Sequence, residues 1–208
     1  MNIFKFLLID AALVIAGIPL LFLLQGAKNK SPFIEKFNKE ELLKKTSVKL
    51  PDTEKLIELE KIAINQGSGI KFDSIMGDWK FVSVWKKDID EEDPIFSSLL
   101  RIFSANMKFT KSISTQDLPK LSVIASIRFG LFTIEFSGPG YLKGKQPFLT
   151  FDLNLIEFKS DSNILLSRSL EEPKEQETSL FALVALEENG EWLVARGQRG
   201  SVVIWVKV

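Results

Sequence analysis

The feature that most constrains the fold is a change of hydrophobic period to two, which begins near residue 77. Trp79 and Phe81 alternate with Lys80, and residues 121–129 alternate between apolar and polar side chains in the same way. A period of two indicates strands with one buried face. Before Gly130 the apolar residues stand at odd positions, and after it they stand at the even positions 132, 134 and 136. Such a shift is typical of a tight turn or a bulge that resets the register.

Turn-forming residues separate the remaining strands. Turns are predicted at residues 138–140, 161–163, 188–190 and 197–200. Further strands are predicted at residues 106–112, 149–156, 163–169, 178–187, 191–196 and 201–208. About eight or nine strands at this spacing leave no room for helical crossovers, so they run antiparallel. The sequence therefore predicts a mainly β fold, as an antiparallel barrel or a sandwich, of which we favour the barrel. Residues 97–103 are ambiguous and also fit a helical turn.

The composition excludes most common enzyme chemistry. The chain has 208 residues, with 27 basic and 27 acidic side chains, no Cys and no His. The lack of Cys excludes disulfides, thiolate catalysis and Cys-ligated metals, and the lack of His excludes Ser-His-Asp hydrolysis. A net charge of zero argues against a nucleic-acid partner. Carboxylates could still bind a cation or act as an acid–base pair, but no pair stands out. We therefore expect no catalytic residues, no metal and no cofactor.

The N-terminal segment has a different character from the rest of the chain. Residues 4–24 form an apolar stretch of 21 residues, close to the roughly 20 that cross a bilayer as a helix. Asp10 interrupts the stretch, and the uninterrupted run of 14 residues that follows it also fits the core of a signal peptide. The small residues that a cleavage site requires are poorly placed, so we favour an uncleaved anchor over residues 1–27. A cleaved signal peptide and a buried helix are the alternatives.

Flanking lysines predict the orientation of this anchor. Lys5 lies at the N-terminal edge of the span, whereas four lysines follow the span at positions 28, 30, 36 and 39. Because Lys and Arg gather on the cytoplasmic side, the rest of the chain is expected on the cytoplasmic or stromal side of a single-pass membrane protein.

Residues 28–74 read as a helical connector before a barrel at 75–208. Ser31 and Pro32 resemble the start of a short amphipathic helix that extends to about residue 45. Pro51 interrupts the chain, Asp52 can cap a second helix over residues 53–66, and Gly67 is its natural stop.

Two motifs that suggest ligand chemistry fail on spacing. Residues 138–145 read GPGYLKGK, but the gap between the glycines does not fit a phosphate-binding loop, and Gln146 follows where Ser or Thr is required. Residues 88–93 are acidic but lack the Gly and Glu of a calcium loop. We expect turns and solvated loops at these places and at the charged residues 171–177.

The two ends of the predicted barrel resemble a known family. Gly77-Asp78-Trp79 opens the first strand, and a Gly-x-Trp start with an Arg near the last strand is similar to lipocalins. The ending LVARGQRGSVV at residues 193–203 resembles more closely the plastid lipid-associated (fibrillin) family. The first strand departs from that family, since it ends in Val84-Trp85-Lys86 instead of an aromatic residue, Thr and Ser. The resemblance implies a lipocalin-like barrel, a photosynthetic membrane such as the thylakoid, and lipids, carotenoids or quinones as ligands.

Barrel closure and ligand contact are predicted for different residues. A Trp can plug a narrow end and an Arg can stack on it, so we expect Arg196 to brace Trp79, although a core Trp with a surface Arg is equally compatible. The residues assigned to closure are Gly77, Trp79, Arg196, Gly197 and Gly200. The residues assigned to an apolar ligand at the open end are Trp79, Phe81, Phe132, Phe136, Phe151 and Leu153.

Three classes of function remain for such a chain. A membrane-tethered binding protein for an apolar molecule is favoured, because a barrel of eight strands can hold one small ligand. A membrane-anchored scaffold with a filled barrel is the main alternative. An enzyme would require a buried carboxylate pair, for which the sequence gives no signal.

Overall fold

The computed structural model of the protein describes residues 48–87, 91–112, 120–145, 147–170 and 179–208. The predicted membrane span and the predicted amphipathic helix that follows it lie outside these ranges. Among the helices that are described, none is both long enough and apolar enough to cross a membrane.

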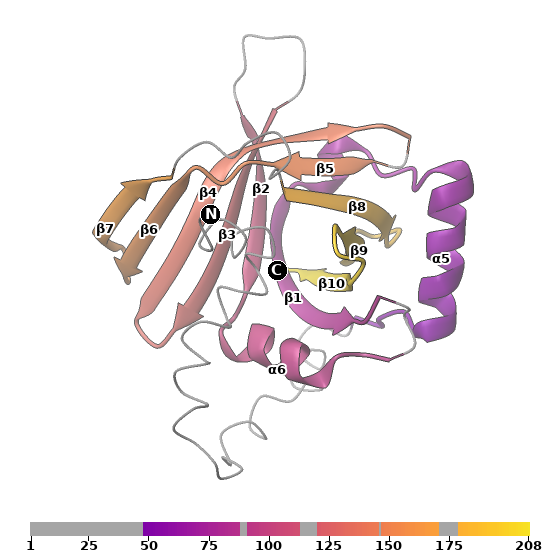
Figure 1. The fold of residues 1–208 in the computed structure, drawn as a ribbon, viewed down its shortest axis with the longest axis horizontal. Coiled ribbons are helices and arrows are strands. Elements are labelled where there is room, and N and C mark those ends of the chain that lie inside the picture. The colour runs from indigo at the N-terminus through magenta and orange to yellow at the C-terminus, as the bar shows by residue number, and fades with distance from the viewer. Residues whose placement is uncertain (1–47, 88–90, 113–119, 146, 171–178) are drawn as a thin grey trace.

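Ten strands, two α-helices and a short 3-10 helix make up the described part of the chain (Figure 1). Their bounds in chain order are α5 (Thr53–Gln66), η2 (Phe72–Ile75), β1 (Gly77–Trp85), α6 (Pro94–Ile102), β2 (Asn106–Ser112), β3 (Lys120–Phe129), β4 (Phe132–Lys143), β5 (Phe148–Phe151), β6 (Leu155–Ser160), β7 (Asn163–Ser169), β8 (Ser179–Leu186), β9 (Trp192–Gly197) and β10 (Val202–Lys207).

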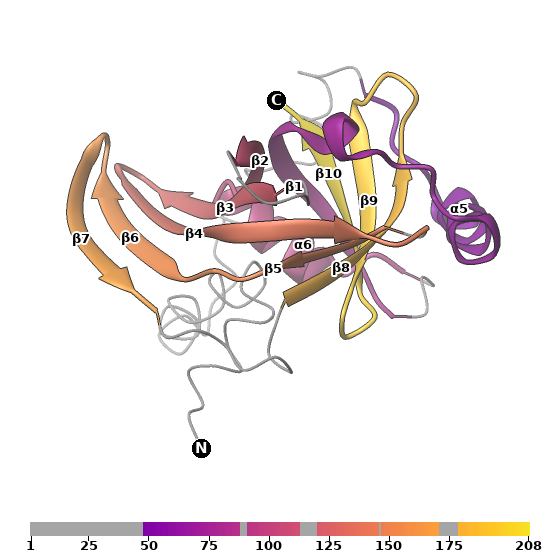
Figure 2. The same cartoon turned by 90° about the horizontal axis from the view of Figure 1, so that it is seen from above.

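Eight of the strands close into an antiparallel barrel. They follow the order β3-β2-β1-β10-β9-β8-β5-β4, and β3 pairs with β4 to complete the circle. Strands β6 and β7 continue from β4 outside the barrel. We call these two strands, with residues 125–129 of β3 and 132–137 of β4, the wing. Figures 1 and 2 both place the wing and helix α5 at opposite ends of the molecule. The predicted antiparallel barrel is confirmed, but the sequence did not predict that β6 and β7 lie outside it.

The wing arises because two different strands share one edge of β4. Residues 132–137 of β4 pair with β6, whereas residues 140–143 pair with β5. The backbone continues the ladder between them, since Asp152 N–H donates to Pro139 O at 3.0 Å and Asn154 N–H donates to Ser137 O at 3.0 Å. From this junction β5 pairs with β8 to close the barrel, and β6 pairs with β7 to form the wing.

Two predictions at this junction are wrong. Residues 138–140 form no turn but lie inside β4, and the strand predicted over residues 149–156 is divided into β5 and β6. The reason is the close approach of the chain at Asp152. A Cβ atom on Gly138 would lie 1.8 Å from the Asp152 carbonyl oxygen, so only glycine fits there. Glycine inside a strand often marks such an approach of another backbone segment.

Helix α5 packs on the outside of the barrel, and its two ends lie where the capping residues predict. The Asp52 carboxylate accepts a hydrogen bond from Lys55 N–H at 2.9 Å, and Gly67 ends the helix with a φ of 88°. Leu56 and Ala63 are buried against outward-facing residues of β8, β9 and β10. The predicted helix over residues 53–66 is confirmed.

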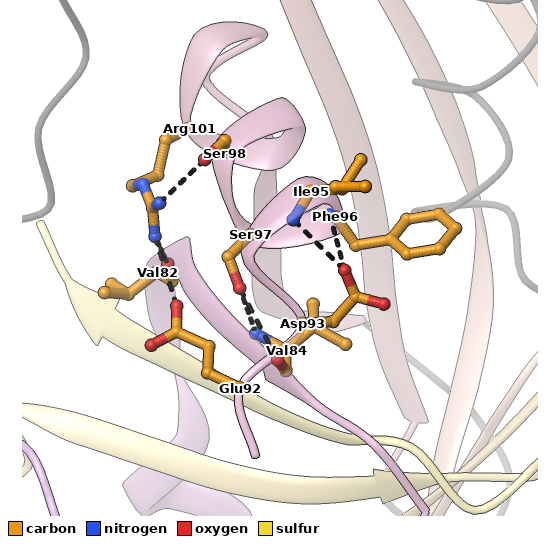
Figure 3. Close-up of polar contacts among 9 residues, drawn as sticks. All are labelled: Val82, Val84, Glu92, Asp93, Ile95, Phe96, Ser97, Ser98 and Arg101. Atoms are coloured by element: carbon orange, nitrogen blue, oxygen red, sulfur yellow. Dashed lines mark hydrogen bonds and ion pairs between the residues drawn. The ribbon is translucent and has the colours of Figure 1, made fainter. Parts of the chain in front are cut away.

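Helix α6 covers one end of the barrel, which settles the ambiguous residues 97–103 as mostly helical. Its Leu100 belongs to the main core. Arg101 donates from Nη1 to Val82 O at 2.6 Å and lies 3.5 Å from the Glu92 carboxylate, while Ser97 Oγ accepts from Val84 N–H at 2.9 Å (Figure 3). Burial lowers the pKa of Arg101, and the Glu92 charge partly offsets this effect. These contacts fix α6 to β1.

The middle of the barrel is packed with aromatic side chains. Trp79, Phe81, Phe109 and Trp205 are among the largest fully buried side chains. The Trp205 ring lies 5.1 Å from the Phe81 ring in an edge-to-face contact, and such pairs contribute about 0.5–1.5 kcal/mol beyond their burial. At this level the protein's own side chains therefore occupy the barrel interior.

Candidate functional site

The wing has one apolar face, which follows from the strand registers. Ile127 is buried in the core, and along one rung of the sheet it stands beside Ile134, Phe158 and Leu166 in turn. Residues that stand opposite one another on paired strands lie on the same face of a sheet. The neighbouring rungs of this face add further apolar side chains. We call the whole set the wing face: Phe129, Phe132, Ile134, Ile156, Phe158 and Leu166.

Three aromatic rings gather on the wing face. The ring centroids of Phe132 and Phe158 lie 5.3 Å apart and nearly parallel, and Phe129 lies 5.8 Å from Phe132 and 6.3 Å from Phe158. Despite these contacts, Phe132 is 39% exposed and Leu166 is 63% exposed. A contiguous exposed apolar patch of this kind is typical of a binding surface.

The wing face continues into the barrel core. Ile134 and Ile156 are partly buried and pack against the main core cluster, to which Phe136 belongs. Phe151 is also in that cluster and stacks on Phe181 with 5.7 Å between ring centroids, and Phe181 is itself only partly buried. An apolar molecule on the wing face would therefore meet apolar side chains all the way to the edge of the core.

The opposite face of the wing is polar. Lys159, which follows Phe158 and so points to the other side, lies 2.8 Å from the Glu135 carboxylate and 2.9 Å from that of Glu157. Burial lowers the pKa of Lys159, but hydrogen bonds and charge from both glutamates outweigh this effect, and the pKa is raised overall. Lys159 thus links two carboxylates across β4 and β6 and leaves one net negative charge on this face, so the two faces of the wing differ in chemistry.

The residues predicted to contact a ligand fall into two groups. Trp79, Phe81, Phe136, Phe151 and Leu153 are buried members of the main core. Phe132 alone lies on the wing face with a substantial exposed area. The sequence-based set therefore mixes residues that fill the barrel with one residue of the exposed apolar surface.

The remaining residues of the wing face were missed by the sequence analysis. Leu166 lies in a predicted strand, whereas Phe158 lies beyond the strand predicted over residues 149–156. The place of both on the wing face depends on the pairing of β4 with β6. That pairing depends on the division of the predicted strand at Asp152, for which the only sequence signal is the pair of glycines at 138 and 140.

The residues predicted to close the barrel act at two separate ends. Trp79 donates its indole N–H to Ile75 O at 2.7 Å, and Lys207 Nζ lies 5.3 Å from the Trp79 ring centroid. Trp79 stands opposite Lys207 near one end of β10, whereas Arg196 stands opposite Val202 at the other end. The sequence analysis predicted that Arg196 contacts Trp79, and this prediction is wrong, because the two residues lie at opposite ends of β10.

Arg196 instead links helix α5 to the turn between β9 and β10. Its Nε and Nη2 atoms bond the two carboxylate oxygens of Glu60, and its Nη1 bonds the carbonyl oxygens of Gly200 and Lys87. The turn itself is closed by a hydrogen bond from Gly200 N–H to Gly197 O at 2.9 Å. The φ of Gly200 is 96° and that of Gly77 is 126°, values that favour glycine.

A hollow of about 230 Å³ lies between the segment before η2 and the β8–β9 turn, apart from the wing face. Its lining residues are Ser68, Gly69, Ile70, Lys71, Ser74, Leu186, Glu187 and Glu188. Glu187 already accepts the backbone N–H of Asn189 at 2.7 Å. In the part of the chain that is described, no group of three or more acidic side chains is placed to hold a metal ion. The wing face therefore remains the better candidate site.

Comparison with models of known protein families finds no match, and comparison with curated proteins finds none either. The resemblance to the plastid lipid-associated family consequently stays a prediction from the residues at the two ends of the barrel.

Proposed function

We propose that the protein is a membrane-tethered, non-catalytic binding protein that holds an apolar small molecule on the wing face. One observation carries the proposal: an exposed apolar surface on the wing continues into the barrel core through Ile134 and Ile156, with Arg168 beside Ile156 at its edge. A fully exposed Phe or Leu side chain gains about 1.5–3 kcal/mol on burial, so a bound apolar molecule would stabilise this surface.

The resemblance to the plastid lipid-associated family makes this proposal more specific. It suggests a lipocalin-like barrel, with a lipid, a carotenoid or a quinone as the ligand and a photosynthetic membrane as the location. In this proposal the apolar residues 4–24 are the tether, and the lysines that follow them favour the cytoplasmic or stromal side for the barrel.

An anchored scaffold with a filled barrel is the second candidate function. It is favoured by the buried aromatic side chains in the middle of the barrel, which include Trp79 and Trp205. In this case the wing face would serve a protein partner instead of a small molecule.

Extraction of the full chain from its native membrane tests the proposed function. The protein is purified in mild detergent, extracted with organic solvent and analysed by mass spectrometry. We expect one lipid, pigment or quinone per chain, and we expect its loss in Phe158→Ser but not in Ile95→Ser, which alters an exposed residue of α6. Absence of a stoichiometric apolar molecule from the unmodified chain would favour the scaffold.

Alkaline carbonate treatment tests the tether separately. The full-length chain should remain in the membrane pellet, and its release into the supernatant would contradict the anchor. Protease added to sealed vesicles of known orientation tests the side, since protection of residues 31–208 from the cytoplasmic face would contradict the proposed orientation.

A further inference from the structure

The far end of the wing, which we call the wing tip, carries an unusual set of exposed apolar residues. Two turns meet there, because Asp161 N–H donates to Leu131 O at 2.9 Å and so joins the β6–β7 turn to the β3–β4 turn. Each of the apolar residues at this tip is at least 39% exposed. They are Leu131, Phe132, Ile164, Leu165 and Leu166.

These side chains lie on both faces of the wing. Leu166 stands opposite Phe158 on the wing face, whereas Ile164 stands opposite Lys159 on the polar face. Leu131 lies in the turn itself and is 66% exposed. A flat protein partner would cover only one of these faces. A lipid bilayer, in contrast, can surround an inserted tip on all sides.

Edge-to-edge pairing with a second copy is opposed by the shape of β7. This strand is the last in the sheet order of the described residues. Its register with β6 shifts at Leu165, where Phe158 stands opposite Leu166 and Lys159 opposite Ile164. Bulges of this kind bend an edge strand and disfavour its pairing with another chain.

Two arginines lie close to the wing tip. Arg128 lies on the second rung from the β3–β4 turn, and Arg168 lies two residues beyond Leu166, roughly 7 Å along the strand. Within the described structure neither arginine forms an ion pair. Asp161 in the turn and the one excess carboxylate charge of Glu135, Glu157 and Lys159 balance the two arginines. Elements that lie at a membrane surface insert their apolar side chains about 5–10 Å into the bilayer. If the apolar tip inserts to this depth, the two arginines lie at the level of the lipid headgroups.

We infer that the wing tip inserts into the surface of a lipid bilayer, independently of the N-terminal segment. The inference rests on the proposed function only in that both place the protein at a membrane. Insertion would bring the wing face directly to the lipid phase, from which an apolar molecule could enter without crossing water.

The lack of native Cys permits a direct test on the full chain. Single-cysteine variants Leu131→Cys and Ile64→Cys are labelled with an environment-sensitive fluorophore and reconstituted in vesicles of phosphatidylcholine with phosphatidylserine. Ile64 is the matched control, because it is 64% exposed and lies on α5 at the opposite end of the molecule. Vesicles with and without doxyl-labelled lipid report contact of each probe with acyl chains.

We expect the probe at position 131 to shift to shorter wavelength and to be quenched severalfold more than the probe at position 64. Adding Arg128→Gln and Arg168→Gln should weaken this quenching in anionic vesicles but not in pure phosphatidylcholine. Equal quenching at the two positions would overturn the inference. A wavelength shift at position 131 without lipid quenching would also overturn it and would point to a protein partner or a second copy.

The same samples separate this inference from the proposed function. Retention in the vesicles after alkaline carbonate treatment reports the tether, and solvent extraction reports the small molecule. Quenching at position 131 in a chain that carries no apolar molecule would leave the inference standing and would contradict ligand binding.

Discussion

The carboxylate of Glu60 on helix α5 accepts two hydrogen bonds from the guanidinium of Arg196 on strand β9. Both side chains are largely buried, and the same guanidinium also bonds the carbonyl oxygens of Gly200 and Lys87. One arginine therefore holds helix α5 and the β9–β10 turn to the barrel, at the end of the molecule opposite the wing (Figure 1).

Arg196→Ala should consequently lower stability without altering ligand affinity. We expect a loss of about 1.5–3 kcal/mol in the free energy of unfolding, the range for hydrogen bonds to charged groups. Arg196→Lys should recover only part of it, because Lys lacks the planar fork that matches a carboxylate. Chemical denaturation measures the loss, and a double-mutant cycle with Glu60→Gln measures the coupling. Additive effects of the two substitutions would contradict the pairing.

Gly138→Ala should disrupt the junction between barrel and wing. The added Cβ would meet the backbone of Asp152, which cannot move without displacing β5 or β6, so we expect a loss of about 3 kcal/mol or more. Gly197→Ala is the control, because its nearest contact is the Phe181 side chain at an ordinary 3.6 Å. Thermal unfolding of both variants checks the prediction. Equal stability of the two variants would contradict the close approach.

Replacing a buried Phe with Ala should lower the free energy of unfolding more than replacing an exposed Phe of the wing face. Phe81→Ala should destabilise the protein by about 3–5 kcal/mol, because it leaves a cavity beside Trp205. Phe132→Ala removes a ring that is 39% exposed and should cost less than half as much. Denaturant titration compares the two losses. A larger loss for Phe132→Ala would show that the wing is part of the core.

The ion triad on the polar face of the wing predicts a dependence on alkaline pH. Because the folded-state pKa of Lys159 is raised above 10.5, its contribution is fully present below that pH and is lost as pH rises through the raised pKa. Lys159→Met should therefore cost about 1–3 kcal/mol near pH 8, and less above the raised pKa. The more exposed pair of Lys108 and Asp78 provides the control, and Lys108→Met should cost under about 1 kcal/mol. If the difference in the free energy of unfolding between wild type and Lys159→Met stays constant from pH 8 to above the raised pKa, the raised pKa is contradicted.

Local sequence signals predicted the elements of this fold well. Alternation identified most of the strands because one face of each strand is buried, and Asp52 with Gly67 marked the ends of α5 because caps act within one turn of a helix. The antiparallel arrangement follows from those elements, since closely spaced strands leave no room for helical crossovers, whereas closure into a barrel instead of a sandwich does not.

Non-local pairings could not be predicted in the same way. The wing depends on the pairing of Phe136 with Ile156, and the Arg196 contact joins residues 136 positions apart in the chain. Neither partner is marked in the local sequence. The glycines at 138 and 140 carry a signal of close approach, but residues of this kind equally predict a turn.

The affinity of the full chain for anthroyloxy-stearate, an apolar fluorescent probe, tests the central claim most directly. We predict that Phe158→Ser and Leu166→Ser weaken binding by at least about tenfold, a loss of about 1.4 kcal/mol, while near-ultraviolet circular dichroism is unchanged. The control Ile64→Ser, which alters a residue as exposed as Leu166, should bind the probe like the unmodified chain. Equal affinity of all four proteins would contradict the assignment of the wing face as the binding site.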